Sequence, residues 1–192
     1  EGLQAYTPVL EIPGEVDLAI IVVNAKFVLS TIDQCHEKGI KGLCIITAGF
    51  KETGAEGAEA EKQLLAKVRE YGMRCVGPNC LGVVNTHPDI RMDGCFAESL
   101  PERGNIGFVS QSGALGGGIL NILKDLNLGF AQFISIGNQA DVNAETALEY
   151  WENEADVEQI LLYMESIQNP ANFRKLASRI SRKKPILALK AG

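Results

Sequence analysis

Near the middle of the 192-residue chain lies the segment Gly104-Asn-Ile-Gly-Phe-Val-Ser-Gln-Ser-Gly-Ala-Leu-Gly-Gly-Gly-Ile-Leu120. Its apolar residues 106–109 predict a short buried strand, and the residues from Ala114 onward predict a helix. Small residues between them allow an anion to approach the backbone closely. Backbone N–H groups at a helix start have no partner inside the helix, and the helix dipole adds positive partial charge there. The segment therefore predicts a phosphate-binding turn, formed by Ser110, Gln111, Ser112, Gly113 and Ala114.

The composition limits what this protein does. Hydrophobic residues make up 46% of the chain and charged residues 22%, which is typical of a soluble globular protein with a core. The formal net charge is -6 and no basic patch is visible, so nucleic acid is not an expected partner. The longest apolar run, residues 18–23, is far too short to cross a bilayer, and the start shows no secretory signal pattern. We therefore expect a cytoplasmic protein that binds neither nucleic acid nor membrane.

The cysteines argue against both a disulfide framework and a metal site. Their number, five, is odd, and no two are spaced as Cys-x-x-Cys. We interpret them as reduced thiols, most of them in a core. They are Cys35, Cys44, Cys75, Cys80 and Cys95.

In the first half of the chain, apolar strand-like runs alternate with amphipathic helical stretches. Strands are expected at 18–23, 43–47 and 73–76, and helices at 26–38 and 56–71. The near-continuous apolar run at 18–23 is typical of a parallel strand covered on both faces. Helical spacing in the first helix predicts an inward face formed by Phe27, Ile32 and Cys35.

Residues 77–104 contain three prolines and several glycines without a helical period, which predicts a long functional loop leading into a linker. The alternation then restarts. Strands are expected at 106–109, 130–135, 159–164 and 185–189, and helices at 114–126, 143–154 and 171–182. The chain thus divides into two βα units, residues 1–97 and 104–192. The predicted fold class is α/β, with two consecutive parallel sheets and right-handed crossovers.

Some polar residues have simple structural explanations. Either Asp141 or Asn143 is expected to cap the helix at 143–154, and for Asn138 a contact with a site is the minority interpretation. Both histidines, His36 and His87, are expected at the surface. The basic run at the end of the helix at 171–182 is interpreted as a solvated helix end.

Ligands in parallel α/β sheets bind beyond the carboxyl ends of the strands. This rule selects the loops after residues 23, 47, 76, 109, 135 and 164. A glycine in one such loop is ordinarily just a turn residue. The order of the loops carries more information than any one of them.

That order is Gly77-Pro-Asn-Cys-Leu-Gly82, then Val109-Ser-Gln-Ser-Gly-Ala-Leu115, then Gly137-Asn138, then an acidic residue, Glu165. With these motifs the chain resembles, over essentially its whole length, the NDP-forming acyl-CoA synthetases, relatives of the succinyl-CoA synthetase α subunit. The resemblance implies that the first unit is part of a CoA-binding Rossmann-like domain. It implies that the second unit is a flavodoxin-like ligase domain.

The resemblance also implies a reaction. An acyl-CoA and phosphate give an acyl phosphate and free CoA, and the phosphoryl group moves to an enzyme histidine. From there it passes to ADP, giving ATP; the reverse direction activates a carboxylic acid. The implied cofactors are CoA and ATP/ADP with Mg, the nucleotide being bound by an ATP-grasp domain or subunit outside this chain. An oligomer is expected.

Site residues follow from the resemblance position by position. Ser112, Gly113 and Ala114 match the helix start that holds the phosphohistidine phosphate, and Glu165 matches the acid that orients the histidine. For Glu165 the alternative is a loop residue facing solvent. Six residues match the edge that contacts CoA: Val23, Asn24, Ile46, Thr47, Ala48 and Gly49.

Asn79 and Cys80 match the loop near the CoA thiol end. For Cys80 a buried structural thiol fits the sequence equally well, and no basic neighbour indicates a nucleophile. Three glycines, 116–118, open the helix at 114–126, and each costs roughly 0.5–1 kcal/mol relative to alanine. They suggest space for a bulky acyl group or close helix packing. Asn24 stands where relatives often have proline, so the acyl specificity stays open.

Neither histidine matches the phosphorylated one of the family, whose position would follow Lys190-Ala191-Gly192. The first strand and glycine-rich loop of a CoA-binding domain would precede Glu1. We therefore expect the chain to be an internal piece of a longer parent protein, inactive by itself. Two alternatives to the ligase remain. One is a regulatory CoA- or acyl-CoA-sensing module of a protein acetyltransferase, and the weaker one is a generic nucleotide-binding Rossmann protein.

Overall fold

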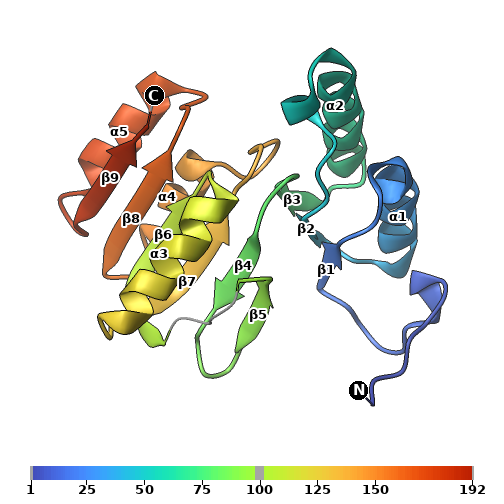
Figure 1. The fold of residues 1–192 in the computed structure, drawn as a ribbon, viewed down its shortest axis with the longest axis horizontal. Coiled ribbons are helices and arrows are strands. Elements are labelled where there is room, and N and C mark those ends of the chain that lie inside the picture. The colour runs from blue at the N-terminus through green and yellow to red at the C-terminus, as the bar shows by residue number, and fades with distance from the viewer. Residues whose placement is uncertain (1, 98–101, 192) are drawn as a thin grey trace.

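The computed structural model describes residues 2–97 and 102–191, which form two α/β units side by side (Figure 1). The sheet of the first unit is parallel, in the order β1-β2-β3. Its strands are β1 (Leu18–Ile21), β2 (Gly42–Ile45) and β3 (Arg74–Val76). Its helices, α1 (Ala25–Lys38) and α2 (Ala55–Glu70), lie above and to the right of this sheet in that view, and Glu61 of α2 contacts Asn138 of the second unit. Short 3-10 turns stand at Val9–Glu11 and Lys51–Thr53.

The helices of the first unit form where local signals and the apolar pattern agree. Asn24 caps α1 by accepting a hydrogen bond from Lys26 N, and Gly39 ends it with a φ of 88°. The residues that α1 buries are Val28, Ile32 and Cys35. The prediction for Phe27 was wrong: its side chain is 52% exposed. Val28, one position further along, points inward instead because 100° separates successive residues of a helix.

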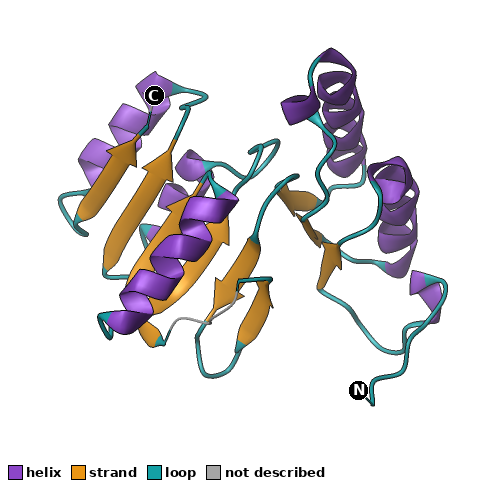
Figure 2. Ribbon diagram, in the orientation of Figure 1, coloured by secondary structure: helices purple, strands orange, loops and turns teal. Residues whose placement is uncertain are grey.

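The second unit holds a six-stranded sheet in the order β5-β4-β7-β6-β8-β9. Figure 2 shows α3 (Gly113–Asp125) on the near face of this sheet, with α4 (Ala144–Trp151) and α5 (Pro170–Ile180) behind it. The strands are β4 (Gly82–Asn85), β5 (Met92–Cys95), β6 (Arg103–Ser110), β7 (Phe130–Ser135), β8 (Gln159–Met164) and β9 (Ile186–Lys190). The α/β class and the two units are confirmed.

The structure corrects the expectation for residues 77–104. Residues 82–95 of this range form the hairpin β4–β5 instead of a loop, and β4 runs antiparallel to β7, with Val83 opposite Ile134. The second sheet is therefore mixed, and only β6 to β9 are parallel. The strands of the hairpin are short, and they become regular by pairing with β7, a partner far along the chain. The division at 97/104 stays a prediction; residues 98–101 lie outside the described residues, and β4 and β5 hydrogen bond to the second sheet.

Backbone contacts join the two units directly. Asn138 N donates to Pro78 O at 2.9 Å, Ala140 N to Gly77 O at 3.1 Å, and Val142 N to Cys75 O at 3.1 Å. Gly137 has a φ of 51°, and a methyl group there would lie 2.3 Å from the carbonyl oxygen of Pro78. Such an approach is open only to glycine, so the two backbones meet at a position that no other residue fits.

A side chain strengthens this junction. Asp141 accepts hydrogen bonds from Arg74 Nε at 2.7 Å and from Cys75 N at 3.0 Å. Of the two residues predicted as possible caps of α4, Asn143 is the cap, since it accepts a hydrogen bond from Thr146 N at 2.9 Å. Asp141 instead joins the two units.

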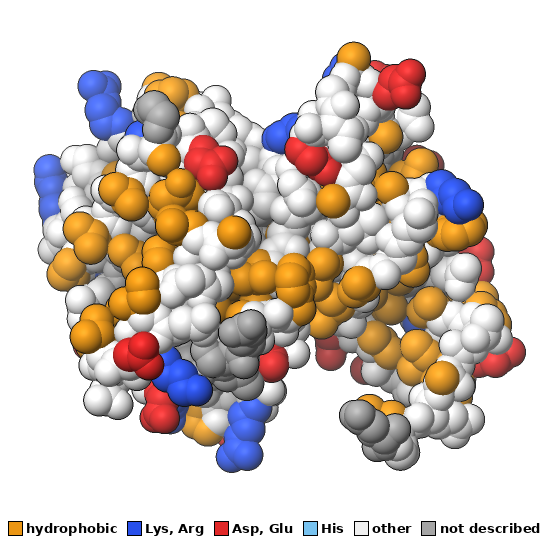
Figure 3. Space-filling model, viewed as in Figure 1, with side chains coloured by type: hydrophobic (Ala, Val, Ile, Leu, Met, Phe, Trp, Pro, Cys, Tyr) orange, Lys and Arg blue, Asp and Glu red, His pale blue; other side chains and the backbone are white. Residues whose placement is uncertain are grey.

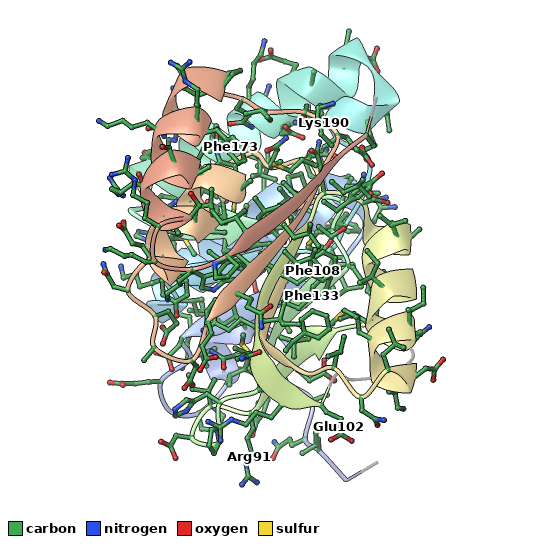
Figure 4. All side chains as sticks on the ribbon, turned by 90° about the vertical axis from the view of Figure 1, so that its left-hand side faces the viewer. Arg91, Glu102, Phe108, Phe133, Phe173 and Lys190 are labelled. Atoms are coloured by element: carbon green, nitrogen blue, oxygen red, sulfur yellow. The ribbon has the colours of Figure 1, made fainter. Side chains whose placement is uncertain are left out.

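The core of the second unit lies on both faces of its sheet. Figure 4 shows Phe108 and Phe133 together next to α3, and their ring centroids are 5.3 Å apart. On the opposite face Trp151 is fully buried and donates from Nε1 to Gln132 Oε1 at 2.8 Å. None of the described helices combines the length and apolarity needed to span a membrane.

The basic run after α5 has a structural role. Arg179 Nη2 and Lys183 Nζ approach the carboxylate of Glu152 at 2.6 and 3.2 Å. Lys184 Nζ donates to the carbonyl oxygens of Trp151 and Glu154. These cations hold the end of α5 against the end of α4. Lys184 also satisfies two carbonyl oxygens at and just after the end of α4.

A pair of glycine substitutions tests this packing. A methyl group at Gly107 would lie 2.9 Å from both the Trp151 ring and Val157, so Gly107→Ala is expected to lower the free energy of unfolding by about 1–3 kcal/mol. Gly118→Ala is the control, because no described atom lies within 4 Å of that position. It is expected to raise the same free energy by roughly 0.5–1 kcal/mol. Urea unfolding followed by fluorescence of Trp151, the one tryptophan of the chain, measures both; equal effects would contradict the packing described.

Candidate functional site

The carboxyl ends of strands from both units border one cleft of about 500 Å³. Figure 3 shows that the surface is also notched between the two units, at the top of that view. Its lining residues are Asn79, Cys80, Leu81, Phe96, Gln111, Ser112, Gly113, Ala114 and Glu165. All of them except Leu81 and Phe96 are candidates from the sequence. Leu81 and Phe96 flank strands of the hairpin, so sequence reasoning that overlooked the hairpin missed them as well.

In the phosphate-binding turn predicted between β6 and α3, Ser110 is buried, whereas residues 111–114 line the cleft. Ser110 is fully buried, and its Oγ donates to Ser112 O at 2.6 Å. Its side chain therefore supports the turn and does not line the cleft, and its part in phosphate binding stays a prediction. Ser112 caps α3, because its Oγ accepts from Leu115 N at 3.3 Å.

The start of α3 faces the cleft through Ser112, Gly113 and Ala114. The backbone N–H groups of a first helical turn have no acceptor within the helix, and the dipole makes this end positive. A methyl group on Gly113 would lie 3.6 Å from Leu81 Cβ, an ordinary contact. The arrangement offers an anion a set of N–H donors.

Gln111 ties this helix start to the loop after β8. Its Oε1 accepts from Glu165 N at 2.9 Å and from Ser166 N at 3.0 Å, while its Nε2 donates to Ser166 Oγ at 3.0 Å. The side chain of Gln139 adds a further hydrogen bond to Ser166 Oγ at 2.9 Å. Glu165 is thereby held at the cleft through its backbone, while its side chain remains exposed.

The predicted CoA edge joins the cleft through backbone contacts. Thr47 Oγ1 donates to Val23 O at 2.7 Å, and Asn79 N donates to Thr47 O at 3.0 Å. The ends of β1, β2 and β3 therefore follow one another toward the cleft. Ala48 is exposed, whereas Ile46 packs into the small core between the units. The side chain of Asn24 is used as the cap of α1.

Cys80 lies at the floor of the cleft and is 4% exposed. Its Sγ is 3.8 Å from Cys44 Sγ and 3.3 Å from Ile45 O. The contact with Cys80, together with burial, raises the pKa of the Cys44 thiol. Burial also raises the pKa of Cys75 to about 12. All five cysteines are free in the structure, and none of these contacts supplies Cys80 with a base.

The three glycines of α3 differ in their surroundings. A methyl group on Gly116 would lie 3.1 Å from both Phe133 and Ser110, so close packing against β6 and β7 accounts for this glycine. The position of Gly117 is 3.6 Å from Leu81, and no described atom lies within 4 Å of Gly118. Close packing thus explains Gly116, a side chain at Gly117 would make an ordinary contact with Leu81, and only Gly118 faces open space.

Neither histidine of the chain lines this cleft. His36 stacks on Tyr71 with ring centroids 3.9 Å apart, and His87 lies 3.5 Å from Asp156. Within residues 2–97 and 102–191, no group of three or more His, Cys, Asp or Glu side chains is arranged to hold a metal ion.

Asn138 forms a polar cluster with Asn79, Glu52 and Glu61 that the sequence analysis did not predict. Asn138 is 6% exposed, and its Nδ2 donates to Glu52 Oε2 at 2.6 Å and to Glu61 Oε2 at 2.7 Å. Burial would raise the pKa of Glu52, but hydrogen bonds from Asn138 and the N–H groups of Gly49 and Phe50 lower it overall. The signal in the sequence was the Gly-Asn pair directly after a strand, in one of the six loops at strand ends.

Comparisons with known proteins agree with this architecture. The family model of the CoA binding domain matches residues 1–86, and that of the succinyl-CoA ligase like flavodoxin domain matches residues 103–192. The α subunit of an ADP-forming acetate–CoA ligase from Pyrococcus furiosus is 48% identical over 192 residues, which are 100% of this chain and 41% of that protein.

Two solved structures match the whole chain. A crystal structure of a Pyrococcus horikoshii protein gives a TM-score of 0.95 at 47% identity and is covered to 43% of its length. The acetyl-coenzyme A synthetase 1 of Ca. Korarchaeum cryptofilum, in complex with phosphate and ADP, gives 0.91 at 37% identity and is covered to 41%.

The fold and the comparisons thus define a CoA-binding domain joined to a ligase-type flavodoxin domain. The chain belongs to the NDP-forming acyl-CoA synthetase family. It spans less than half the length of the relatives described above.

The role of Gln111 can be tested by amide hydrogen exchange. Gln111→Ala removes the acceptor of Glu165 N and Ser166 N, so both amides are expected to exchange about tenfold faster. Gln34→Ala is the control, since Gln34 accepts from Val9 N in the first unit, remote from this loop. Unchanged exchange at residues 165 and 166 in Gln111→Ala would show that the loop is held by other contacts.

The lowered pKa of Glu52 predicts an acid-sensitive junction. A carboxyl group whose pKa is lower in the folded than in the unfolded state stabilises the fold above its ordinary pKa, here near 4.5, and loses that effect as the pH falls through the folded value. The stability difference between the wild type and Glu52→Gln should therefore shrink between about pH 6 and about pH 3. Chemical unfolding at a series of pH values measures this; a constant difference contradicts it.

Proposed function

We propose that the parent protein is an ADP-forming acyl-CoA synthetase, an acid–thiol ligase that interconverts acyl-CoA, ADP and phosphate with carboxylic acid, CoA and ATP. The observation that carries this proposal is the single cleft that unites the start of α3, Glu165 and the Asn79–Cys80 loop. These groups come from both family domains. Family membership and the ADP-forming ligases among the relatives support the same reading.

In the proposed reaction, a phosphate oxygen attacks the thioester carbonyl carbon of the acyl-CoA. The C–S bond breaks, CoA leaves as the thiolate and takes up a proton, and an acyl phosphate forms. A histidine of the parent protein outside this chain then takes the phosphoryl group, releasing the carboxylate. The histidine passes the group to ADP. The N–H groups at Ser112, Gly113 and Ala114 stabilise the phosphoryl charge throughout.

The remaining side chains have supporting roles in this proposal. Glu165 orients the histidine by accepting its ring N–H, and Gln111 holds the backbone of Glu165 in place. Ser110 acts only through the turn, since it is buried. CoA follows the edge from Val23 and Asn24 past Thr47, Ala48 and Gly49, with its thiol end near Asn79 and Cys80. Ile46 contributes to this edge through packing.

Partners and substrates follow the same reasoning. The Pyrococcus furiosus relative is named as a subunit alpha, so we expect an ATP-grasp domain or subunit as partner, holding the nucleotide with Mg, and an oligomeric assembly. The acyl group belongs to a carboxylic acid that reaches the cleft past Leu81 and Phe96. The relatives described above give no support to the acyl-CoA-sensing alternative.

The proposal predicts that the parent protein turns ATP over to ADP continuously only when both a carboxylic acid and CoA are present, and that ATP alone gives a phosphoenzyme intermediate with a single equivalent of ADP. Glu165→Gln should lower phosphoenzyme formation by about 10²–10⁴-fold, the range of a positioned acid–base group. Labelling with [γ-³²P]ATP measures the intermediate.

The control for that experiment is Glu158→Gln. Glu158 precedes β8, at the end of the strand opposite Glu165, and it accepts from Asn105 Nδ2 at 2.7 Å. Its replacement should leave the phosphoenzyme unchanged. Full phosphoenzyme in Glu165→Gln would remove Glu165 from the mechanism, and sustained ADP formation over many turnovers without CoA would overturn the proposed reaction.

A further inference from the structure

Asn138 occupies a position where both units and both parts of the candidate site meet. It stands in the loop after β7, in the second unit, yet its hydrogen bonds run mainly to the first. Its Nδ2 donates to Glu52 and Glu61, and its Oδ1 accepts from Asn79 Nδ2 at 3.3 Å. Its carbonyl oxygen accepts from Lys51 Nζ. Every polar atom of the side chain is therefore engaged.

Glu52 extends these contacts to the CoA edge. While its Oε2 accepts from Asn138, its Oε1 accepts from Gly49 N at 2.5 Å and from Phe50 N at 3.1 Å. Gly49 has a φ of 107°, a conformation that other residues rarely adopt. One carboxylate thus holds a left-handed turn of the CoA edge on one side and a side chain of the ligase-type unit on the other.

The chemistry of the cluster requires an amide at position 138. Glu61 is 8% exposed, and burying a carboxylate is costly unless it is hydrogen bonded. A single –NH₂ group with two protons serves both carboxylates at once, while the amide oxygen is left for Asn79. An aspartate would place a third negative charge against Glu52 and Glu61, with Lys51 as the cation beside them at 3.5 Å from Glu61.

Docking of the two units does not by itself need this cluster. The backbone hydrogen bonds of residues 138–142, the Arg74–Asp141 ion pair and the apolar contacts around Cys44 and Val83 already join them. The Asn138 cluster differs from these contacts because it involves residues of the candidate site. Asn138 contacts the cleft residue Asn79 directly, and it contacts Glu52, which in turn accepts from Gly49 N.

We propose that Asn138 is a positioning residue that couples the CoA edge to the phosphate-binding cleft, through Glu52 on one side and Asn79 on the other. The inference rests on the proposed function, since it concerns the binding of CoA. According to this inference, CoA affinity depends on Asn138, which belongs to the ligase-type unit and accepts a hydrogen bond from Asn79. The side-chain amide of Asn138 fixes the position of the turn at Gly49 relative to the loop at Asn79.

The test is a double-mutant cycle in the parent protein, with CoA binding measured by titration calorimetry. Asn138→Asp should bind CoA about tenfold more weakly, because it sets like charges against each other where a charged hydrogen bond stood. Glu52→Gln should also weaken binding, since an amide has one acceptor oxygen and cannot accept from both Asn138 and the N–H groups of Gly49 and Phe50. In the double variant Glu52→Gln/Asn138→Asp the amide of residue 52 can donate to the carboxylate at 138, so part of the lost affinity should return, although Glu61 still faces that carboxylate.

Asp141→Asn is the matched control, because Asp141 also joins the units but makes no contact with Gly49, Glu52 or Asn79. It should lower the melting temperature and leave CoA affinity unchanged. If Asn138→Asp fails to fold, Glu52→Gln and the double variant still decide the question.

The possible outcomes distinguish failure of the proposed function from failure of the coupling through Asn138. A wild-type parent protein that does not bind CoA overturns the proposed function and this inference with it. Normal wild-type binding together with unchanged affinity in Glu52→Gln and Asn138→Asp overturns the coupling alone. The same holds if Asp141→Asn weakens CoA binding as much as Asn138→Asp, or if the double variant shows no recovery.

Discussion

The structure depends on a close approach of two backbone segments, residues 75–78 at the end of β3 and residues 137–142 after β7. Hydrogen bonds from Asn138 N, Ala140 N and Val142 N cross between the units, and Gly137 lies where any side chain would collide with Pro78. Because both segments follow strands at their carboxyl ends, this contact brings the ligand-binding edges of two sheets together. A cleft shared by both units follows from that geometry.

The electrostatics of the cleft are local. With a net charge of -6, the chain as a whole repels anionic ligands such as CoA and phosphate. The compensating features are the positive end of α3 and the backbone donors around it, which act within a few ångströms. The acidic side chains of the junction are meanwhile hydrogen bonded to Asn138 and to backbone N–H groups, which offsets the cost of burying their charge.

Regular elements with strong local signals were predictable, and the exceptions have physical causes. The five α-helices begin within one residue of their predicted starts, because a cap or a change of hydrophobic period marks each of them. The hairpin β4–β5 was missed because its short strands are stabilised by pairing with β7 and not by their own pattern. Phe27 was placed inward by its apolar character, although α1 turns Val28 to the core.

The sequence by itself determined the α/β class, the order of the loops at the strand ends and the small-residue turn at Ser112-Gly113, because these depend on local periodicity and residue size. Only the tertiary structure decided which of those loops share a cleft, that Ser110 is buried and that Asp141 joins the units while Asn143 caps α4. It also revealed the position of Asn138 between Glu52, Glu61 and Asn79. Such contacts join residues far apart in the chain, and no local pattern encodes which side chains a folded junction will bring within hydrogen-bonding distance.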